Sequence, residues 1–229
     1  MSALDDHLVN TGMGRDAALI WGSFLGVWDR LLTKAHGELI SEPMWSEFKE
    51  PITSRPHEND LTVGLYHRMV DLIDSADIDD PIRDYVIKTE DPVPDRNRRG
   101  SKSRRADFKV ERRYPGVSSN HLAVEAKRIL VKNDITTKYL GEEGLGCFLT
   151  KDSPYCSGPV GILLAYTFDA TAELTEEIIT SITNASQDDE IGLRLELKDH
   201  AYIALCKHNR KSLSLPPIVL MHSSLAFPD

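Results

Sequence analysis

The sequence predicts a single domain of the mixed α/β (α+β) class that spans residues 1–229. At 229 residues the chain can bury one substantial core. Apolar residues recur at helical spacing in the first third of the chain, whereas alternating and near-continuous apolar runs dominate the rest. A further helical pattern lies between these strand patterns, and no internal repeat is present. Helices and strands are therefore expected to share one core.

The N-terminal region, about residues 1–56, is predicted to be mainly helical. In "DAALIWGSFLGVWDRLLTKAHG" apolar residues recur every three or four positions, and the broad stripe indicates a buried helix that should end at Gly37. The next stretch, "SEPMWSEFKEPITSRP", is punctuated by prolines and is expected to be irregular or only briefly helical. A second helix is predicted from near Glu58 to Ala76.

The middle of the chain predicts a hairpin preceded by a basic loop. "YVIKTED" (85–91) is expected to be a short strand. A mobile loop is predicted over about 92–105, because "PVPDRNRRGSKSRR" carries prolines, glycine and serines. "RADFKVE" (105–111) and "HLAVEAK" (121–127) both alternate, and a Pro-Gly pair separates them. These two segments are predicted to form an antiparallel hairpin.

The last third of the chain predicts four strands and one or two helices. The first half of "NDITTKYLGEEGLGCFLT" could be a helix. "GPVGILLAYTF" (158–168) is a near-continuous apolar run, which is typical of a strand covered on both faces. "TAELTEEIITSITNAS" has helical periodicity. Three further strands are expected at 192–198, 201–207 and 216–224.

Cysteine usage and apolar run length suggest a reduced cytoplasmic protein. The three cysteines are odd in number and show no CxxC spacing, so they predict packed side chains and give no zinc signature. No apolar run approaches the roughly 20 residues that cross a bilayer, so no membrane partner is expected. The opening "MSALDDHLVN" lacks the basic and apolar regions of a secretion signal. His57, His121 and His222 are interpreted as hydrogen-bonded structural residues.

The charge distribution favours a nucleic-acid partner even though the net charge of the chain is −9. From Arg96 to Lys138 the sequence contains thirteen Lys or Arg and four acids, a local balance of +9. Such a stretch creates a local positive field that the net charge conceals. A solvated loop is the alternative. The predicted nucleic-acid-binding residues are Arg96, Arg98, Arg99, Lys102, Arg104, Arg105, Arg128 and Lys132.

Two acids and a lysine are expected to converge on the polar side of the hairpin. If the hairpin turns about Gly116, Asp107 lies opposite Glu125, and directly paired side chains have Cβ atoms roughly 4.5–5.5 Å apart. Lys127 lies on the same side as Glu125. Neighbouring carboxylates repel unless a cation lies between them, and Mg2+ prefers oxygen ligands. The alternative is a cross-strand ion pair on a solvated sheet face, worth about 0–1 kcal/mol.

Asp107 followed by Glu125-x-Lys127 on the next strand resembles the signature of the PD-(D/E)XK nuclease superfamily, the fold of many restriction endonucleases. In that superfamily the first acid lies on one strand and the (D/E)xK on its neighbour, and a preceding helix often adds a glutamate, which Glu58 matches. The resemblance implies a restriction-endonuclease-like central mixed sheet flanked by helices. It also implies that Asp107, Glu125, Lys127 and Glu58 are catalytic. Asp107, Glu125 and Glu58 would hold Mg2+, for which Mn2+ can substitute.

Two further positions bear on this resemblance. Tyr139, in "TTKYLGEEG", is similar to a position near the active site and would position water. Ala106 stands where the motif has proline. Three other [DE]xK matches compete with Glu125-Ala-Lys127, namely Glu47-Phe-Lys49, Asp107-Phe-Lys109 and Glu196-Leu-Lys198. Glu196 lies on a predicted strand and is the strongest of these competitors.

The resemblance implies metal-dependent hydrolysis of phosphodiester bonds. The expected activity is that of a DNA endonuclease in a microbial (anti-phage) defence system, with RNA as the other substrate to test. Because no separate recognition domain is evident, a protein partner or a homo-oligomer is expected. The alternative is a catalytically inactive nuclease-fold module that binds nucleic acid or a protein.

Overall fold

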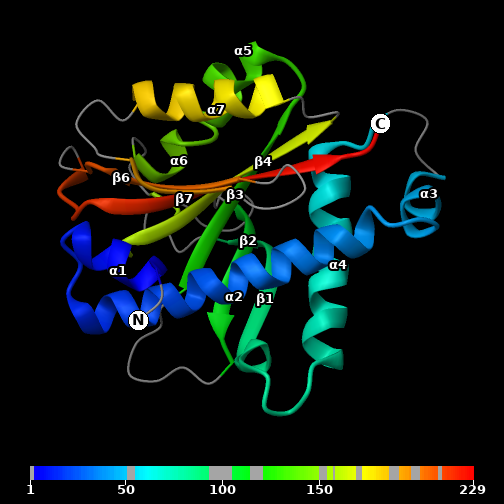
Figure 1. Cartoon of the computed structure of the whole chain (residues 1–229), viewed down its shortest axis with the longest axis horizontal. Helices are drawn as coiled ribbons and strands as arrows, with labels where there is room; N and C mark the ends of the chain where they lie inside the picture. The colour runs from blue at the N-terminus through cyan, green and yellow to red at the C-terminus, as the bar shows by residue number, and fades with distance from the viewer. Residues whose placement is uncertain are drawn as a thin grey trace.

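A seven-stranded mixed sheet with helices on both faces forms the centre of the computed structural model (Figure 1). This architecture confirms the predicted mixed α/β class. The structure describes residues 3–50, 55–92, 105–113, 121–149, 154–156, 158–168, 172–185, 191–196, 202–210 and 213–229. Within these ranges, no helix is long and apolar enough to cross a membrane.

The helices and strands follow the predicted order closely. The helical elements are α1 (Ala3–Asn10), α2 (Arg15–Leu39), α3 (Met44–Lys49), α4 (Glu58–Ser75), the 3-10 turn η1 (Pro81–Asp84), α5 (Lys132–Asp134), the π-helical turn η3 (Ile135–Tyr139), α6 (Gly146–Leu149) and α7 (Ala172–Ala185). The strands are β1 (Tyr85–Pro92), β2 (Arg105–Arg112), β3 (His121–Ile129), β4 (Val160–Phe168), β5 (Ile191–Glu196), β6 (Tyr202–His208) and β7 (Ile218–Phe227).

The strands lie in the order β1-β2-β3-β4-β7-β6-β5. β1, β2 and β3 form an antiparallel meander, β3, β4 and β7 are parallel to one another, and β6 and β5 return antiparallel. The predicted hairpin register is confirmed, because Phe108 pairs with Val124 and Glu111 pairs with His121. This register brings Asp107 to the position opposite Glu125, just beyond the last paired residues. The connection that contains Gly116 lies outside the described residues.

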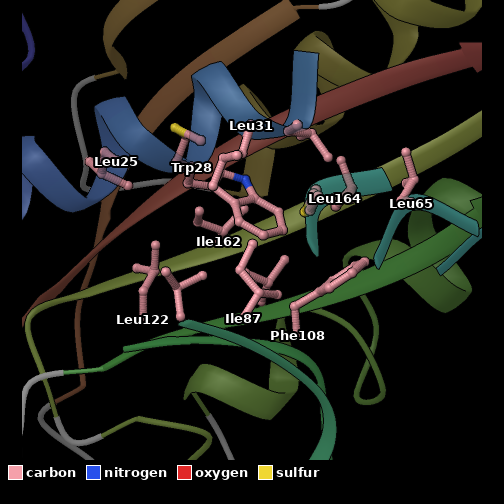
Figure 2. Close-up of a cluster of buried hydrophobic side chains, with 14 of the residues drawn as sticks. Leu25, Trp28, Leu31, Leu65, Ile87, Phe108, Leu122, Ile162 and Leu164 are labelled. Atoms are coloured by element: carbon pink, nitrogen blue, oxygen red, sulfur yellow. The ribbon is translucent and has the colours of Figure 1, made fainter. Parts of the chain in front are cut away.

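Apolar layers cover both faces of the sheet, and Figure 2 shows part of one of them. On one face, Trp28 of α2 and Leu65 of α4 pack against residues such as Phe108, Val124 and Ile162. The other face lies under η3, α6 and α7, where Tyr139, Phe148 and Ile178 are among the buried residues. Because side chains alternate along a strand, each central strand contributes to both layers. β4 is buried along its whole length, as its continuous apolar run predicts.

The structure departs from the sequence predictions in two places. α1 lies in the region predicted to be mainly helical, but no separate helix was predicted there, and its Leu8 is fully buried against the helical layer. α2 continues past Gly37 to Leu39, because the side chain of Leu39 is buried in the core and stabilises the two added residues in the helix. The short helix α3 agrees with the prediction that the stretch after α2 is at most briefly helical, and its Trp45 is buried. Residues 93–104, most of the predicted basic loop, lie outside the described residues.

Candidate active site

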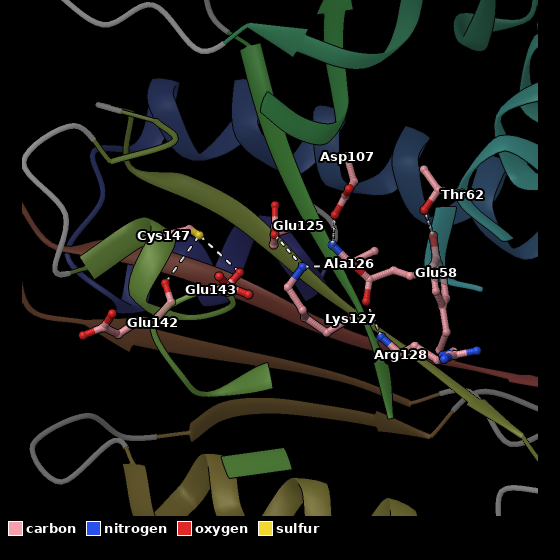
Figure 3. Close-up of polar contacts among 11 residues, drawn as sticks. Glu58, Thr62, Asp107, Glu125, Ala126, Lys127, Arg128, Glu142, Glu143 and Cys147 are labelled. Atoms are coloured by element: carbon pink, nitrogen blue, oxygen red, sulfur yellow. Dashed lines mark hydrogen bonds and ion pairs between the residues drawn. The ribbon is translucent and has the colours of Figure 1, made fainter. Parts of the chain in front are cut away.

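The four residues predicted to be catalytic converge along the second half of β3 (Figure 3). Glu58 is the first residue of α4, Asp107 lies on β2, and Glu125 and Lys127 lie on β3. Val124 and Ala126 face the layer formed by α2 and α4, so alternation turns Glu125 and Lys127 to the opposite face. The hairpin and the start of α4 together bring these side chains into contact.

The carboxylate of Asp107 is held by the backbone of the neighbouring strand. Its Oδ2 accepts a hydrogen bond from the Ala126 amide at 2.6 Å. Ala126 lies between Glu125 and Lys127, so this bond ties the first acid directly to the Glu-x-Lys segment. A charge-assisted bond of this length restricts the carboxylate to one orientation.

Glu58 is anchored in the same way on the other side of Lys127. Its Oε2 accepts a hydrogen bond from the Arg128 amide at 2.7 Å, and its Oε1 accepts one from Lys127 Nζ at 3.1 Å. As the first residue of an 18-residue helix, Glu58 also lies where the helix dipole favours negative charge. Both outer acids are therefore positioned by β3 itself.

Glu125 is the most buried member of the cluster, with 5 % exposure. Its Oε1 lies 2.7 Å from Lys127 Nζ, whereas its Oε2 is buried and has no hydrogen-bond partner among the described residues. Burial and the nearby charge of Asp107 raise the pKa of Glu125 to about 8, although Lys127 opposes this shift. Burial alone would lower the pKa of Lys127, but the charges of Glu125, Glu58 and Asp107 outweigh it and raise that pKa.

The cluster therefore carries more acids than cationic partners. Glu58, Asp107 and Glu125 together offer three carboxylates, and among the ion pairs of the described part of the chain Lys127 contributes one ammonium to two of them. Without further positive charge, Glu125 is largely protonated at neutral pH. The donors that remain for a cation are carboxylate oxygens, and this donor set suits a hard divalent ion such as Mg2+ or Mn2+. The residues at this site fit the predicted metal.

An open groove of about 410 Å³ begins at Glu58. His57, Asn59, Arg128 and Lys138 complete its lining. The Arg128 guanidinium donates to the Pro56 carbonyl at 2.8 Å, and Lys138 forms an ion pair with Asp134 at 2.8 Å. The groove thus combines one acid of the cluster with two cationic side chains. Lys138 was not among the predicted nucleic-acid-binding residues, although it ends the basic stretch of the sequence.

The structure places the other predicted binding residues unevenly. Arg128 lies at the groove, whereas Arg105 is exposed at the start of β2. Lys132 is also exposed and lies 3.3 Å from Glu177 of α7. The remaining predicted residues lie outside the described residues, namely Arg96, Arg98, Arg99, Lys102 and Arg104.

Tyr139 occupies a deeper position than the resemblance suggests. It is fully buried, and its hydroxyl donates to the Leu163 carbonyl at 3.0 Å and lies 3.2 Å from His222 Nδ1. These two contacts direct the hydroxyl between β4 and β7. These two contacts point the hydroxyl beneath η3, whereas the predicted water-positioning role would require it to face the carboxylate cluster.

The competing [DE]xK matches lie in different surroundings. Glu47 and Lys49 are on the short helix α3, and Glu196 is the last residue of β5, with Lys198 outside the described residues. Lys109 forms an ion pair with Glu111 at 2.7 Å. In Glu125-Ala-Lys127 the lysine pairs with both Glu125 and Glu58, and the Ala126 amide donates to Asp107.

Sequence reasoning missed two features near this site. Tyr155 is buried, and the pKa of its hydroxyl is raised by burial and by the charge of Glu125, so it lies within electrostatic reach of the cluster. A second group, formed by Cys206, His208 and His222, lies on the same face of the sheet. The signal for it was present in Cys206-x-His208, which alternation along β6 places on one side of the strand.

Comparisons of this chain with family models, with curated proteins and with solved structures find no match. The geometry of its own residues therefore carries the functional interpretation.

Proposed function

We propose that this protein is a metal-dependent nuclease of the PD-(D/E)XK type that hydrolyses phosphodiester bonds, with DNA as its substrate. The observation that carries the proposal is the buried Glu125 Oε2, which lacks a hydrogen-bond partner among the described residues in a cluster of three acids around one lysine. A cation beside this oxygen would satisfy it and would lower the pKa of Glu125. The alternative, a cross-strand ion pair on a solvated sheet face, would not bury a carboxylate oxygen of Glu125 without a partner.

Each residue of the cluster has a defined task in this proposal. Glu125 and Asp107, with Glu58 beside them, would hold Mg2+, which when bound supplies polarisation of the phosphate and acidification of water. Lys127 is fixed by Glu125 and Glu58 at 2.7 and 3.1 Å, so its ammonium is presented on rigid backbone. From there it can orient a water molecule and stabilise charge that develops on the phosphate. Asp107 and Glu58, which bond to β3 amides, keep the arrangement in place before substrate arrives.

The order of the elements supports the superfamily assignment within this proposal. An acid on β2, a Glu-x-Lys on the adjacent antiparallel β3 and a glutamate on the preceding helix α4 agree with the pattern that the sequence resembles. Action in the cytoplasm as part of a microbial defence system, with a protein partner or as a homo-oligomer, belongs to the same proposal. The three cysteines form no disulfide, which is compatible with a reducing compartment.

The proposal is tested by incubating the protein with supercoiled plasmid and Mg2+ or Mn2+. We expect metal-dependent nicking that EDTA abolishes. Lys127→Ala is expected to reduce the rate by about a hundredfold to a thousandfold, the range seen when one charge-stabilising donor is removed. Lys88→Ala is the matched control, since Lys88 pairs with Glu111 on the neighbouring strand. Intact plasmid, single-stranded DNA and RNA under all these conditions would contradict a nuclease.

Substrate binding at the groove gives a second prediction. Lys138→Gln is expected to weaken DNA binding and to reduce the slope of log K against log salt by about 1, because one phosphate contact is lost. Lys34→Gln, on the exposed side of α2, is the matched control and should leave the slope unchanged. Fluorescence anisotropy with a labelled duplex at several salt concentrations measures both. Equal slopes for the wild type and Lys138→Gln would exclude the groove as part of the DNA-binding surface.

A non-catalytic module is the second candidate, and one observation favours it. Lys127 already bridges two of the acids, so part of the negative charge is balanced without a metal. Such a module would bind DNA through the groove but would not cleave it under any metal condition. The two assays above separate this outcome from the nuclease.

A further inference from the structure

A cysteine and two histidines meet in the interior of the sheet layer under η3 and α6. Cys206 and His208 lie two residues apart on β6, and His222 lies on the adjacent strand β7. One ligand atom from each of the three side chains lies within 4.8 Å of the other two. All three residues are buried, with exposures of 0 %, 4 % and 0 %. This group shares no residue with the candidate active site.

Each of the two histidines carries a buried ring nitrogen that lacks a hydrogen-bond partner among the described residues. The Nε2 atoms of His208 and His222 are buried and have no hydrogen-bond partner among the described residues. Buried polar atoms in folded proteins nearly always have a hydrogen-bond partner, because an unsatisfied buried polar atom destabilises the folded state. Two such nitrogens beside one buried thiol point to a shared partner that can accept lone pairs.

The contacts of Tyr139 assign the proton on His222. The Tyr139 hydroxyl lies 3.0 Å from the Leu163 carbonyl, which can only accept, so the hydroxyl proton is directed there. The tyrosine oxygen then accepts from His222 Nδ1–H at 3.2 Å. In neutral imidazole only one nitrogen carries a proton, so His222 Nε2 holds a bare lone pair. A hydrogen bond to the far nitrogen is the usual outer contact of a metal-binding histidine.

The surroundings keep both rings uncharged and able to act as ligands. Burial lowers the pKa of His208 to about 4. Burial, followed by the neighbouring His208, also lowers the pKa of His222. The centroids of the two rings lie 5.8 Å apart, and the ring planes meet at an angle of 57°. Neutral imidazole is the form that binds metal ions.

We propose that Cys206, His208 and His222 form a buried site for a transition-metal ion with the preferences of Zn2+. Thiolate and imidazole together suit such an ion, whereas Mg2+ prefers oxygen ligands. Zn–N and Zn–S bonds of about 2.1 and 2.3 Å require ligand atoms roughly 3.3–3.8 Å apart, so the side chains would move inward by about 1 Å. The Cys206 thiol releases its proton to solvent as the metal–sulfur bond forms. A water molecule or an added ligand can take the fourth tetrahedral position.

A metal at this site would stabilise the C-terminal half of the sheet. It would link β6 to β7 directly and, through the Tyr139 hydroxyl, connect them to η3 and to Leu163 of β4. Leu163 pairs with Glu125 across the β3–β4 ladder. The site therefore lies on the same face of the sheet as Glu125, two strands further along, and would act as a structural support, whether or not the candidate active site cleaves nucleic acid.

The test uses the full chain and Co2+ as a probe for the Zn2+ site. The protein is refolded with Co2+ after removal of bound metal by a chelator, and the visible and near-ultraviolet spectra are recorded. We expect roughly one tightly bound ion per chain and a thiolate-to-cobalt charge-transfer band, which carboxylate ligands cannot produce. Excess Mg2+ should leave the band in place, and stoichiometric Zn2+ should remove it. Metal analysis of the protein as purified should find zinc.

Matched variants assign the band to the proposed residues. Cys206→Ser should abolish it, and His208→Gln and His222→Gln should weaken Co2+ binding at least tenfold. Cys156→Ser is the control, because Cys156 is equally buried near Arg210 and should keep the band. Glu125→Gln should also keep it, which separates this site from the candidate active site. Absence of the band in the wild-type protein would contradict the proposal, and so would a band that persists in Cys206→Ser. Neither outcome depends on the variants being as stable as the wild type.

Discussion

Glu125→Gln is expected to reduce metal-dependent cleavage by about a thousandfold while the thermal stability of the metal-free protein stays equal or rises. The loss of activity follows because an amide cannot replace the carboxylate as a ligand, and a factor of a thousand corresponds to about 4 kcal/mol of transition-state stabilisation. The stability result follows from burial, since desolvation and Asp107 both disfavour the charged form of this side chain. Glutamine keeps the size of the residue and one acceptor for Lys127 without that charge.

The opposite signs of these two effects distinguish a catalytic acid from a structural ion pair. If Glu125 only paired with Lys127, its replacement would lower the melting temperature. Glu111→Gln is the matched control, because Glu111 lies on β2 and pairs with Lys88 and Lys109 near the surface. It should leave the cleavage rate unchanged. Full activity of Glu125→Gln would exclude Glu125 from the reaction.

The metal-free protein is expected to lose several kcal/mol of its free energy of unfolding as the pH rises from about 4.5 to about 8. In the folded state the pKa of Glu125 is raised from 4.5 to about 8 by burial, so the folded protein holds this proton more tightly than the unfolded chain. The contribution of Glu125 is complete below its unfolded pKa and is lost as the pH passes through its folded pKa. Mg2+ binds the ionised form, so its stabilising effect should grow over the same interval.

Urea unfolding at pH 5 and pH 8.5, with EDTA or with Mg2+, measures this coupling. The difference between wild type and Glu125→Gln isolates the single carboxyl, because all other groups titrate in both proteins. We expect the difference in EDTA to favour the variant at high pH and to shrink when Mg2+ is added. Parallel pH profiles for the two proteins would mean that Glu125 ionises normally.

The sequence predicted the candidate site well because the site depends on local patterns. Alternation in β2 and β3 and the turn between them are enough to set the register, and the register brings Asp107 opposite Glu125. The predicted start of α4 at Glu58 was also confirmed. Helix ends that depend on packing were harder to predict, as α2 shows by continuing past Gly37 to bury Leu39.

The depth of a polar residue was not predictable from local pattern. The Tyr139 hydroxyl was expected near the acids predicted to be catalytic, yet it bonds to Leu163 and His222 beneath η3. Similarly, Lys138 reaches the groove beside Glu58 through the path of a π-helical turn that spacing alone does not indicate. Both positions depend on how η3 packs against the sheet.

The sequence by itself determined the fold class, the hairpin and the acid–acid–lysine pattern, because these follow from residue periodicity within about twenty positions. Only the tertiary structure decided which charges are buried and which distant residues meet. Burial leaves Glu125 Oε2 without a partner and raises the pKa of that residue, and strand order joins His222 to Cys206 and His208. Both outcomes depend on the low dielectric and the long-range contacts of the packed sheet, which no local stretch of sequence encodes.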